Sequence, residues 1–280
     1  MTELASADRF RLSAHLAYLF EGLPLAARFN GARRAGFRAI EIPDPYGLSI
    51  SDFAALCTQN DLGVAQIALP NGRCGASKKG FAALPGKETE FEDALMRSIA
   101  FAKAVDCPMI HPMSGTYVPS EPLPRWETYL SNIAKACSVA ANEGLCVIME
   151  AISSSGTPDY FMNSLQRASA AIDLVDAPNL FLLVDTFHAA AMGVELPSFL
   201  LERAGRIAHV QVADWPRRNE PGSGEIDFDA VFAALAASNY KGHVGLEYVP
   251  SLKGAGRFDW TGKFDAYLEP LRNQEEWATN

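Results

Sequence analysis

Short apolar segments rich in β-branched residues recur along the whole chain, and each is followed by a polar loop and then by an amphipathic stretch. The clear strand candidates are residues 39–42, 63–69, 145–150, 180–185, 207–212 and 243–248, with weaker candidates at 12–20 and 108–111. Helical patterns cover residues 88–105, 125–142, 164–175 and 228–237. Strands that alternate with helices in this way predict a parallel sheet covered by helices.

Eight such units in one chain close most simply into a barrel. The 280 residues contain no low-complexity tract and no Pro/Ser-rich linker, and α/β barrels of about 250 residues commonly form one domain. We therefore predict a single (β/α)8 TIM-barrel domain over residues 1–280. A doubly wound open sheet is the alternative, but no GxGxxG motif follows the first strand to support it.

Four of the predicted strands end in a polar residue, at the point where the apolar run gives way to a loop. These residues are Glu150, Asp185, Gln211 and Glu247. Because side chains alternate between the faces of a strand, a strand that fills a barrel directs its last residue inward at the mouth. The spacings of 35, 26 and 36 residues bracket the roughly 31 residues per unit of an eight-unit barrel. The four side chains are predicted to meet at the C-terminal face, where barrel active sites lie.

Three carboxylates and one amide around a single axis favour a bound cation. Without a cation, carboxylates so close together would repel and raise one another's pKa values. A ligand set made only of oxygen atoms favours Mg2+ or Mn2+ over Zn2+. Taken singly, each of these residues is better explained as a loop cap or a salt-bridge partner. Their occurrence on four consecutive strands is what favours a metal site.

Other polar residues near these strand ends are candidates for binding a substrate. His188 lies three residues after Asp185 and reaches the same mouth if the loop there opens a helix. Arg217 and Arg218 follow Gln211 on a loop rich in Pro and Gly. One of the two arginines could hold an anionic group, because guanidinium pairs bidentately with a carboxylate.

The remaining histidines and one glutamate also fall on predicted strands. His15, His111 and Glu41 lie near strand ends and could line the mouth, although a structural role is the simpler interpretation. His209 and His243 lie lower on their strands, so we interpret them as packed, hydrogen-bonded interior residues.

The charge balance of 24 basic against 33 acidic residues gives a net charge of -9. This charge disfavours a nucleic-acid backbone or an anionic membrane as partner, because either requires a positive field. Five cysteines without CxxC spacing indicate reduced thiols, and neither a signal-peptide core nor a run of ~20 apolar residues is present. We expect a cytoplasmic protein that acts on small molecules, and copies of the chain could pair through the outer helices.

Six motifs, spread in order over nearly the whole chain, are similar to those of one known family. They are FAALPGKETE (81–90), PDYF (158–161), APNL (177–180), DTFH (185–188), ADWPRRNEPGSGEI (213–226) and GLEYVP (245–250). The sequence resembles hydroxypyruvate isomerases, within the wider group of xylose-isomerase-like barrels. The resemblance implies a divalent-metal site formed by Glu150, Asp185, Gln211 and Glu247, with Glu150 and Glu247 also acting as acid/base groups.

The resemblance also implies that His188 and one arginine bind the substrate. The isomerase pattern aligns best with Arg218, whereas the spacing in related epimerases favours Arg217. Three departures from the family pattern lie where the substrate should bind. His15 stands where an Asn is common, which makes it a further substrate-binding candidate, and Trp215 replaces a smaller polar residue. Residues 151–155 (AISSS) replace the usual Pro and Asn-Thr-Arg-like stretch.

The function implied is isomerisation of a small hydroxy-carbonyl acid, such as hydroxypyruvate (to tartronate semialdehyde) or a 2-oxo-tetronate. The metal would act as a Lewis acid that stabilises an ene-diolate, and Glu150 and Glu247 would transfer the protons. A ketose 3-epimerase and a non-catalytic sugar-acid binder on the same scaffold are the alternatives. A repair nuclease like endonuclease IV is disfavoured, since that chemistry uses a His-rich zinc cluster and this acidic chain has five histidines.

Overall fold

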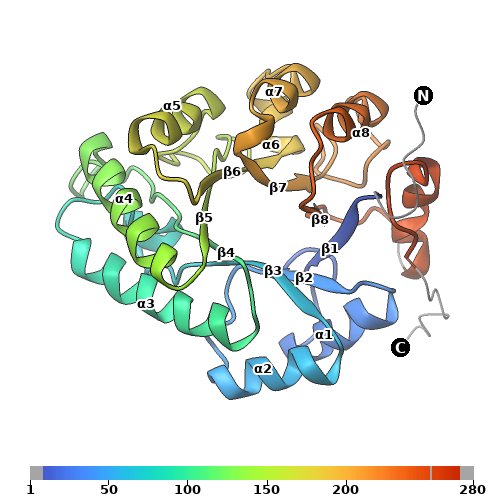
Figure 1. Ribbon diagram of the computed structural model, residues 1–280, viewed down its shortest axis with the longest axis horizontal. Coiled ribbons are helices and arrows are strands. Elements are labelled where there is room, and N and C mark those ends of the chain that lie inside the picture. The colour runs from blue at the N-terminus through green and yellow to red at the C-terminus, as the bar shows by residue number, and fades with distance from the viewer. Residues whose placement is uncertain (1–8, 253, 272–280) are drawn as a thin grey trace. The chain divides into compact units, whose positions relative to one another are not determined.

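The computed structural model describes residues 9–252 and 254–271. Eight strands form a closed barrel in the order in which they occur along the chain (Figure 1). The strands are β1 (Arg11–His15), β2 (Ala39–Ile42), β3 (Gly63–Ala68), β4 (Met109–His111), β5 (Cys146–Glu150), β6 (Leu180–Asp185), β7 (Ile207–Val212) and β8 (His243–Leu246). The predicted (β/α)8 barrel is confirmed.

Helices follow the strands. The α-helices are α1 (Leu25–Arg34), α2 (Ile50–Gln59), α3 (Glu88–Ala104), α4 (Trp126–Asn142), α5 (Leu165–Val175), α6 (Thr186–Ala191), α7 (Leu196–Glu202) and α8 (Phe228–Ala237). The described residues also form the 3-10 helices η2 (Gly75–Lys79), η3 (Ala204–Arg206) and η4 (Gly254–Phe264). Within residues 9–252 and 254–271, no helix combines the length and the apolar character needed to cross a bilayer.

The chain divides into two compact units by the density of its internal contacts. Of the described residues, the first unit comprises 9–41, 55–63, 184–252 and 254–271, and the second comprises 42–54 and 64–183. The assignment of the whole chain to one domain stays a prediction.

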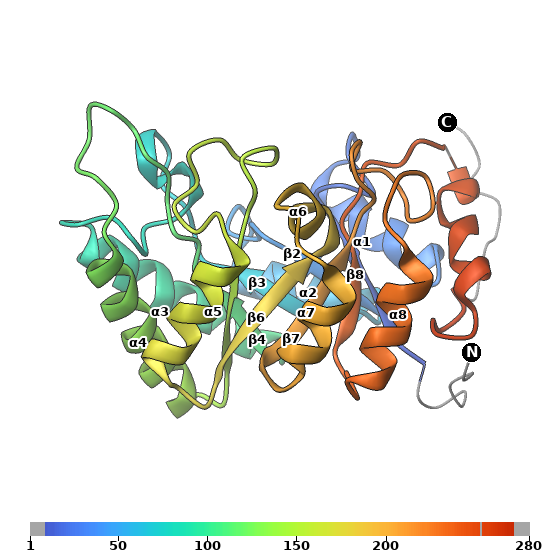
Figure 2. The same ribbon diagram turned by 90° about the horizontal axis from the view of Figure 1, so that it is seen from above.

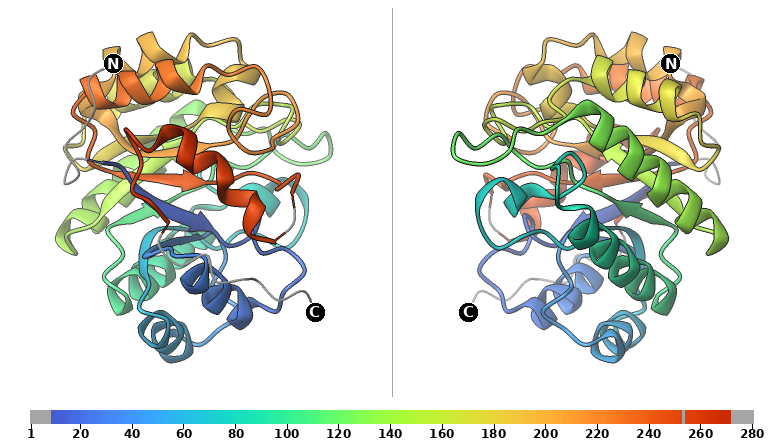
Figure 3. Two further views of the ribbon diagram at one scale, coloured as in Figure 1. Left: turned by 90° about the vertical axis from the view of Figure 1, so that its right-hand side faces the viewer. Right: turned by 90° about the vertical axis from the view of Figure 1, so that its left-hand side faces the viewer.

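In the first unit, β1 pairs in parallel with β2 and β8, and β7 pairs with β8. The register sets Ser13 opposite Ala39 and Gln211 opposite Gly245. Helix α8 (orange) and η4 (red) both lie in this unit (Figure 3, left). They contact each other through aromatic rings, since the Phe232 ring lies edge-on to Phe264 with centroids 5.1 Å apart.

In the second unit, β3, β4, β5 and β6 pair in parallel in sequence order. Helices α3, α4 and α5 lie side by side along it (Figure 2). The buried residues of α4, including Tyr129, Ile133, Ala136 and Ala140, recur every three or four positions and form one helix face. Burial of this face explains why the periodic pattern predicted the helix correctly.

The first predicted strand is too long. We predicted residues 12–20, but β1 ends at His15, and the amides of Tyr18 and Leu19 donate to the His15 carbonyl in a turn. The following apolar residues, such as Leu19 and Phe20, are buried in that turn. Apolar character alone does not distinguish a buried turn from a strand.

Candidate functional site

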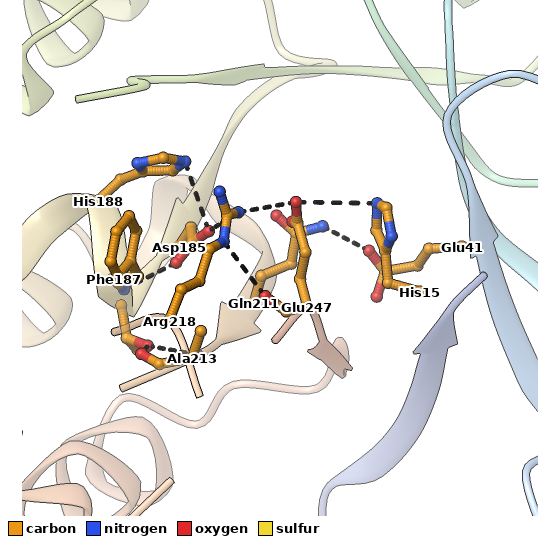
Figure 4. Close-up of polar contacts among 10 residues, drawn as sticks. His15, Glu41, Asp185, Phe187, His188, Gln211, Ala213, Arg218 and Glu247 are labelled. Atoms are coloured by element: carbon orange, nitrogen blue, oxygen red, sulfur yellow. Dashed lines mark hydrogen bonds and ion pairs between the residues drawn. The ribbon is translucent and has the colours of Figure 1, made fainter. Parts of the chain in front are cut away.

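Arg218 lies between two acidic side chains that the sequence placed at strand ends. Its Nη2 atom is 2.9 Å from Asp185 Oδ2 and 2.8 Å from Glu247 Oε1 (Figure 4). The guanidinium carbon also lies 4.7 Å from the centroid of the Tyr18 ring and 5.1 Å from that of Phe187. The guanidinium therefore joins the ends of β6 and β8 and offsets the repulsion between two buried carboxylates.

The loop after β7 places Arg218 through the buried carboxylate of Asp214. That carboxylate accepts hydrogen bonds from the backbone amides of Gly222, Gly224 and Ile226 at 2.8–3.0 Å. Arg218 itself has a left-handed backbone with φ of 57°, and its amide donates to the Asp214 carbonyl at 2.9 Å. Asp214 thus closes the loop that directs Arg218 toward the strand ends.

Asp185 has two roles because it ends β6 and begins α6. Its Oδ1 accepts the amide of Phe187 at 2.7 Å, which caps the helix, as Asp does at many helix N-termini. Its Oδ2 lies 3.7 Å from Nε2 of His188. The sequence analysis expected His188 to reach the barrel mouth if the loop after Asp185 began a helix, and α6 does begin there. Asp185 therefore lies close to both His188 and Arg218.

Gln211 is held by a residue to which the sequence assigned no clear role. Its Nε2 donates to Oε2 of Glu41 at 2.6 Å (Figure 4). Burial raises the pKa of Glu41. The effects of His209, whose Nε2 lies 3.0 Å from Glu41 Oε1, and of the hydrogen bond from Ser13 are larger in sum, and they lower that pKa to about 2. Gln211 is 2% exposed, and its Oε1 accepts no hydrogen bond from the part of the chain that the structure describes.

His15 lies on the other side of Glu247. Its Nε2 is 3.9 Å from Glu247 Oε1, and its ring lies edge-on to Tyr18 with centroids 5.1 Å apart. Burial lowers the pKa of His15 to about 4, against the opposing effect of the Glu41 charge. His15 is therefore neutral at pH 7, and its ring can donate one hydrogen bond and accept another.

Glu150 ends β5 in the second unit and is buried. In the β5–β6 register it lies opposite Leu183, two residues before Asp185. Glu150 is therefore a buried carboxylate at the end of its strand, while Asp185 and His188 lie together in the first unit. His188 thus places an imidazole beside one of the carboxylates that the sequence predicted as oxygen ligands.

The two adjacent arginines differ in their surroundings. Arg218 is part of the polar group just described, whereas Arg217 is exposed. Arg217 lines a separate cavity of about 210 Å3 with Trp215 and Glu225. The sequence left open which arginine faces the mouth, and in the structure Arg218 contacts the strand-end carboxylates.

Several residues of the site lay outside the sequence prediction or were given only a structural role. Tyr18 and Asp214 were not singled out, although the glycines after Asp214 were a signal that a short acidic side chain could accept their amides. His209 is fully buried beside Glu41, as expected of an interior residue, whereas His243 is only partly buried.

Comparison with known proteins gives consistent results. Residues 29–263 match the family of xylose isomerase-like TIM barrels. The chain is 37% identical over 249 residues to a putative hydroxypyruvate isomerase of Mus musculus, which covers 86% of this chain and 90% of the mouse protein. It is 31% identical over 251 residues to a 2-oxo-tetronate isomerase of Pectobacterium atrosepticum, with coverage of 89% and 96%. A crystal structure named AP endonuclease, family 2, from Brucella melitensis superposes with a TM-score of 0.86 at 30% identity, with coverage of 91% and 99%.

Proposed function

This chain belongs to the xylose isomerase-like TIM barrel family, and from that premise we propose that it is a metal-dependent isomerase of a small hydroxy-carbonyl acid. Hydroxypyruvate and 2-oxo-tetronates are the substrate candidates, since curated relatives that match most of the chain carry those names. The positive charge of Arg218 among buried acidic residues suits a substrate that carries a carboxylate.

The buried oxygen of Gln211 is the observation that carries the metal proposal. Its Oε1 accepts no hydrogen bond from the described residues, and a buried acceptor left in that state costs about 1–3 kcal/mol. A divalent cation would use this oxygen together with carboxylate oxygens of Glu150, Asp185 and Glu247, and Mg2+ or Mn2+ fits such donors. When bound, such an ion supplies a Lewis acid that polarises the substrate carbonyl.

Glu150 and Glu247 are the proposed proton-transfer groups. In an aldehyde–ketone isomerisation, one carboxylate removes the proton from the hydroxyl-bearing carbon beside the carbonyl, and a carboxyl group returns a proton to the former carbonyl carbon. The proton of the substrate hydroxyl passes to the former carbonyl oxygen, so the two oxygens exchange roles. Glu247 lies between Arg218 and the neutral His15. In this proposal Arg218 binds the substrate carboxylate, and His15 and His188 orient its oxygens.

Proton exchange followed by NMR in D2O tests the proposed reaction. Hydroxypyruvate and a 2-oxo-tetronate are each incubated with the Mg2+-loaded protein, and we expect deuterium to enter at the carbon beside the carbonyl as the isomer appears. Exchange confined to neutral ketoses would favour the epimerase alternative. An acid that binds and stays chemically unchanged would make the chain a sugar-acid binder.

Replacing Glu247 separates catalysis from folding. Glu247→Gln should lower the exchange rate about 10²–10⁴-fold, the usual contribution of a general base, while the far-UV circular dichroism stays unchanged. Arg217→Gln is the matched control because Arg217 is exposed on a neighbouring loop. An unchanged exchange rate in Glu247→Gln would remove this carboxylate from the mechanism.

The name of the Brucella structure raises the possibility of a nuclease. We favour the isomerase because the net charge of -9 opposes binding to a phosphate backbone. Cleavage of abasic duplex DNA by the Mn2+-loaded protein would contradict this choice. Pairing of the chain with a second copy stays a prediction.

A further inference from the structure

Glu41 is a carboxylate enclosed in the barrel interior, and both of its oxygens have close partners. Its Oε1 accepts the Ser13 hydroxyl at 2.6 Å and lies 3.0 Å from Nε2 of His209. Its Oε2 accepts Nε2 of Gln211 at 2.6 Å. Glu41 is 0% exposed, so it contacts no solvent and cannot itself receive a substrate through the mouth.

The hydrogen bond from Gln211 determines which end of the amide faces inward. A carboxylate only accepts hydrogen bonds, whereas an amide has one accepting oxygen and one donating nitrogen. With Nε2 directed at Glu41, the oxygen of Gln211 must point away from it. That oxygen is the buried Oε1 that accepts no hydrogen bond from any described residue.

The neighbouring strand leaves room for the carboxylate. Gly245 of β8 lies opposite Gln211 in the register, and a Cβ atom there would overlap Oε1 of Glu41. Burying the charge of Glu41 costs free energy because the carboxylate loses its water. In addition, β8 has a glycine, and so no side chain, at the position beside this carboxylate. Apolar side chains at positions 41 and 211 would stabilise the barrel at least as well as this buried carboxylate and amide.

We propose that Glu41 is a positioning residue that fixes the Gln211 amide so that its oxygen, and not its nitrogen, is presented to a divalent cation. This inference rests on the proposed function, because it assumes that Gln211 is a metal ligand. Residues that orient metal ligands in this way typically contribute 10–100-fold to metal affinity.

The first test is Glu41→Gln, which is close in shape but can donate as well as accept. The new amide can donate to Gln211 Oε1 and turn that oxygen away from the mouth. Titration calorimetry with Mn2+ should show a dissociation constant raised about 10–100-fold. Ser13→Ala is the matched control: it removes another hydrogen bond to Glu41 but keeps the bond to Gln211, so its dissociation constant should stay within about twofold of wild type.

The second test exchanges the two groups. In the double variant Glu41→Gln/Gln211→Glu, the amide at position 41 donates to a carboxylate at position 211, whose second oxygen remains available. Mn2+ affinity should recover to within about threefold of wild type, since the order of donor and acceptor is restored. A merely structural role predicts no recovery, because the barrel interior would then carry two substitutions instead of one.

The outcomes separate this inference from the proposed function. Suppose that the wild-type protein binds Mn2+. The role of Glu41 alone is then overturned if Glu41→Gln has the same Mn2+ dissociation constant as wild type, or if the double variant binds Mn2+ as weakly as Glu41→Gln. Failure of the wild-type protein to bind Mn2+ or Mg2+ overturns both the metal proposal and this inference.

Discussion

Arg217 and Arg218 are neighbours in sequence, but only Arg218 contacts the candidate site. Arg218→Gln should lower kcat/KM for a carboxylated substrate about 10–100-fold, since a hydrogen bond to a charged group contributes about 1.5–3 kcal/mol and 1.4 kcal/mol corresponds to a tenfold change. Arg217→Gln should leave kcat/KM within about twofold, as is usual for an exposed side chain. Steady-state kinetics of the two variants makes the comparison.

Metal affinity provides a check on the same arginine. Arg218 pairs with Asp185 and Glu247, two of the proposed ligands, so its removal should not weaken Mn2+ binding, because one cation beside those carboxylates repels another. Equal losses of kcat/KM in the two arginine variants, or weaker Mn2+ binding in Arg218→Gln, would contradict the substrate role of Arg218.

At the level of elements, the loop after β7 depends on Asp214. Asp214→Ala should lower the free energy of unfolding by about 2–4 kcal/mol, because a buried charged acceptor of three backbone amides is lost. It should also raise KM, since Arg218 is then no longer held. Glu225→Ala, an exposed residue of the same loop, should change stability by less than about 0.5 kcal/mol. Urea unfolding measures both, and equal effects would show that Asp214 does not organise the loop.

The elements that the sequence predicted well are those with a repeating burial pattern. Helix α8 matches the predicted range of residues 228–237, because its apolar face recurs with the helical period. Helix α6 was not predicted, since six residues are too few for a period to be visible. The side chain of Asp185 caps its start, but the sequence analysis predicted Asp185 as a metal ligand.

At the scale of the whole molecule, several residues of the candidate site could be predicted from the sequence, but the contacts among them could not. An apolar strand that ends in a polar residue is a local signal, and it located Asp185, Gln211 and Glu247. The contact between Gln211 and Glu41 joins residues 170 positions apart. Such a contact depends on how the barrel strands are placed side by side, and no local pattern encodes it.

The pH dependence of stability is also a property of the whole fold, and His243 contributes to it. Burial, followed by the charges of Arg11 and His209, lowers the pKa of His243 from 6.5 to about 4. Between those values the unfolded chain binds a proton that the folded chain does not, so the stabilisation is complete above pH 6.5 and is lost as the pH falls toward 4. From pH 7.5 to pH 5, wild type should lose about 2 kcal/mol more unfolding free energy than His243→Gln. Urea unfolding at the two pH values measures this difference, in which the other titrating groups cancel. Equal losses in the two proteins would mean that His243 accepts a proton as readily in the folded barrel as in the unfolded chain.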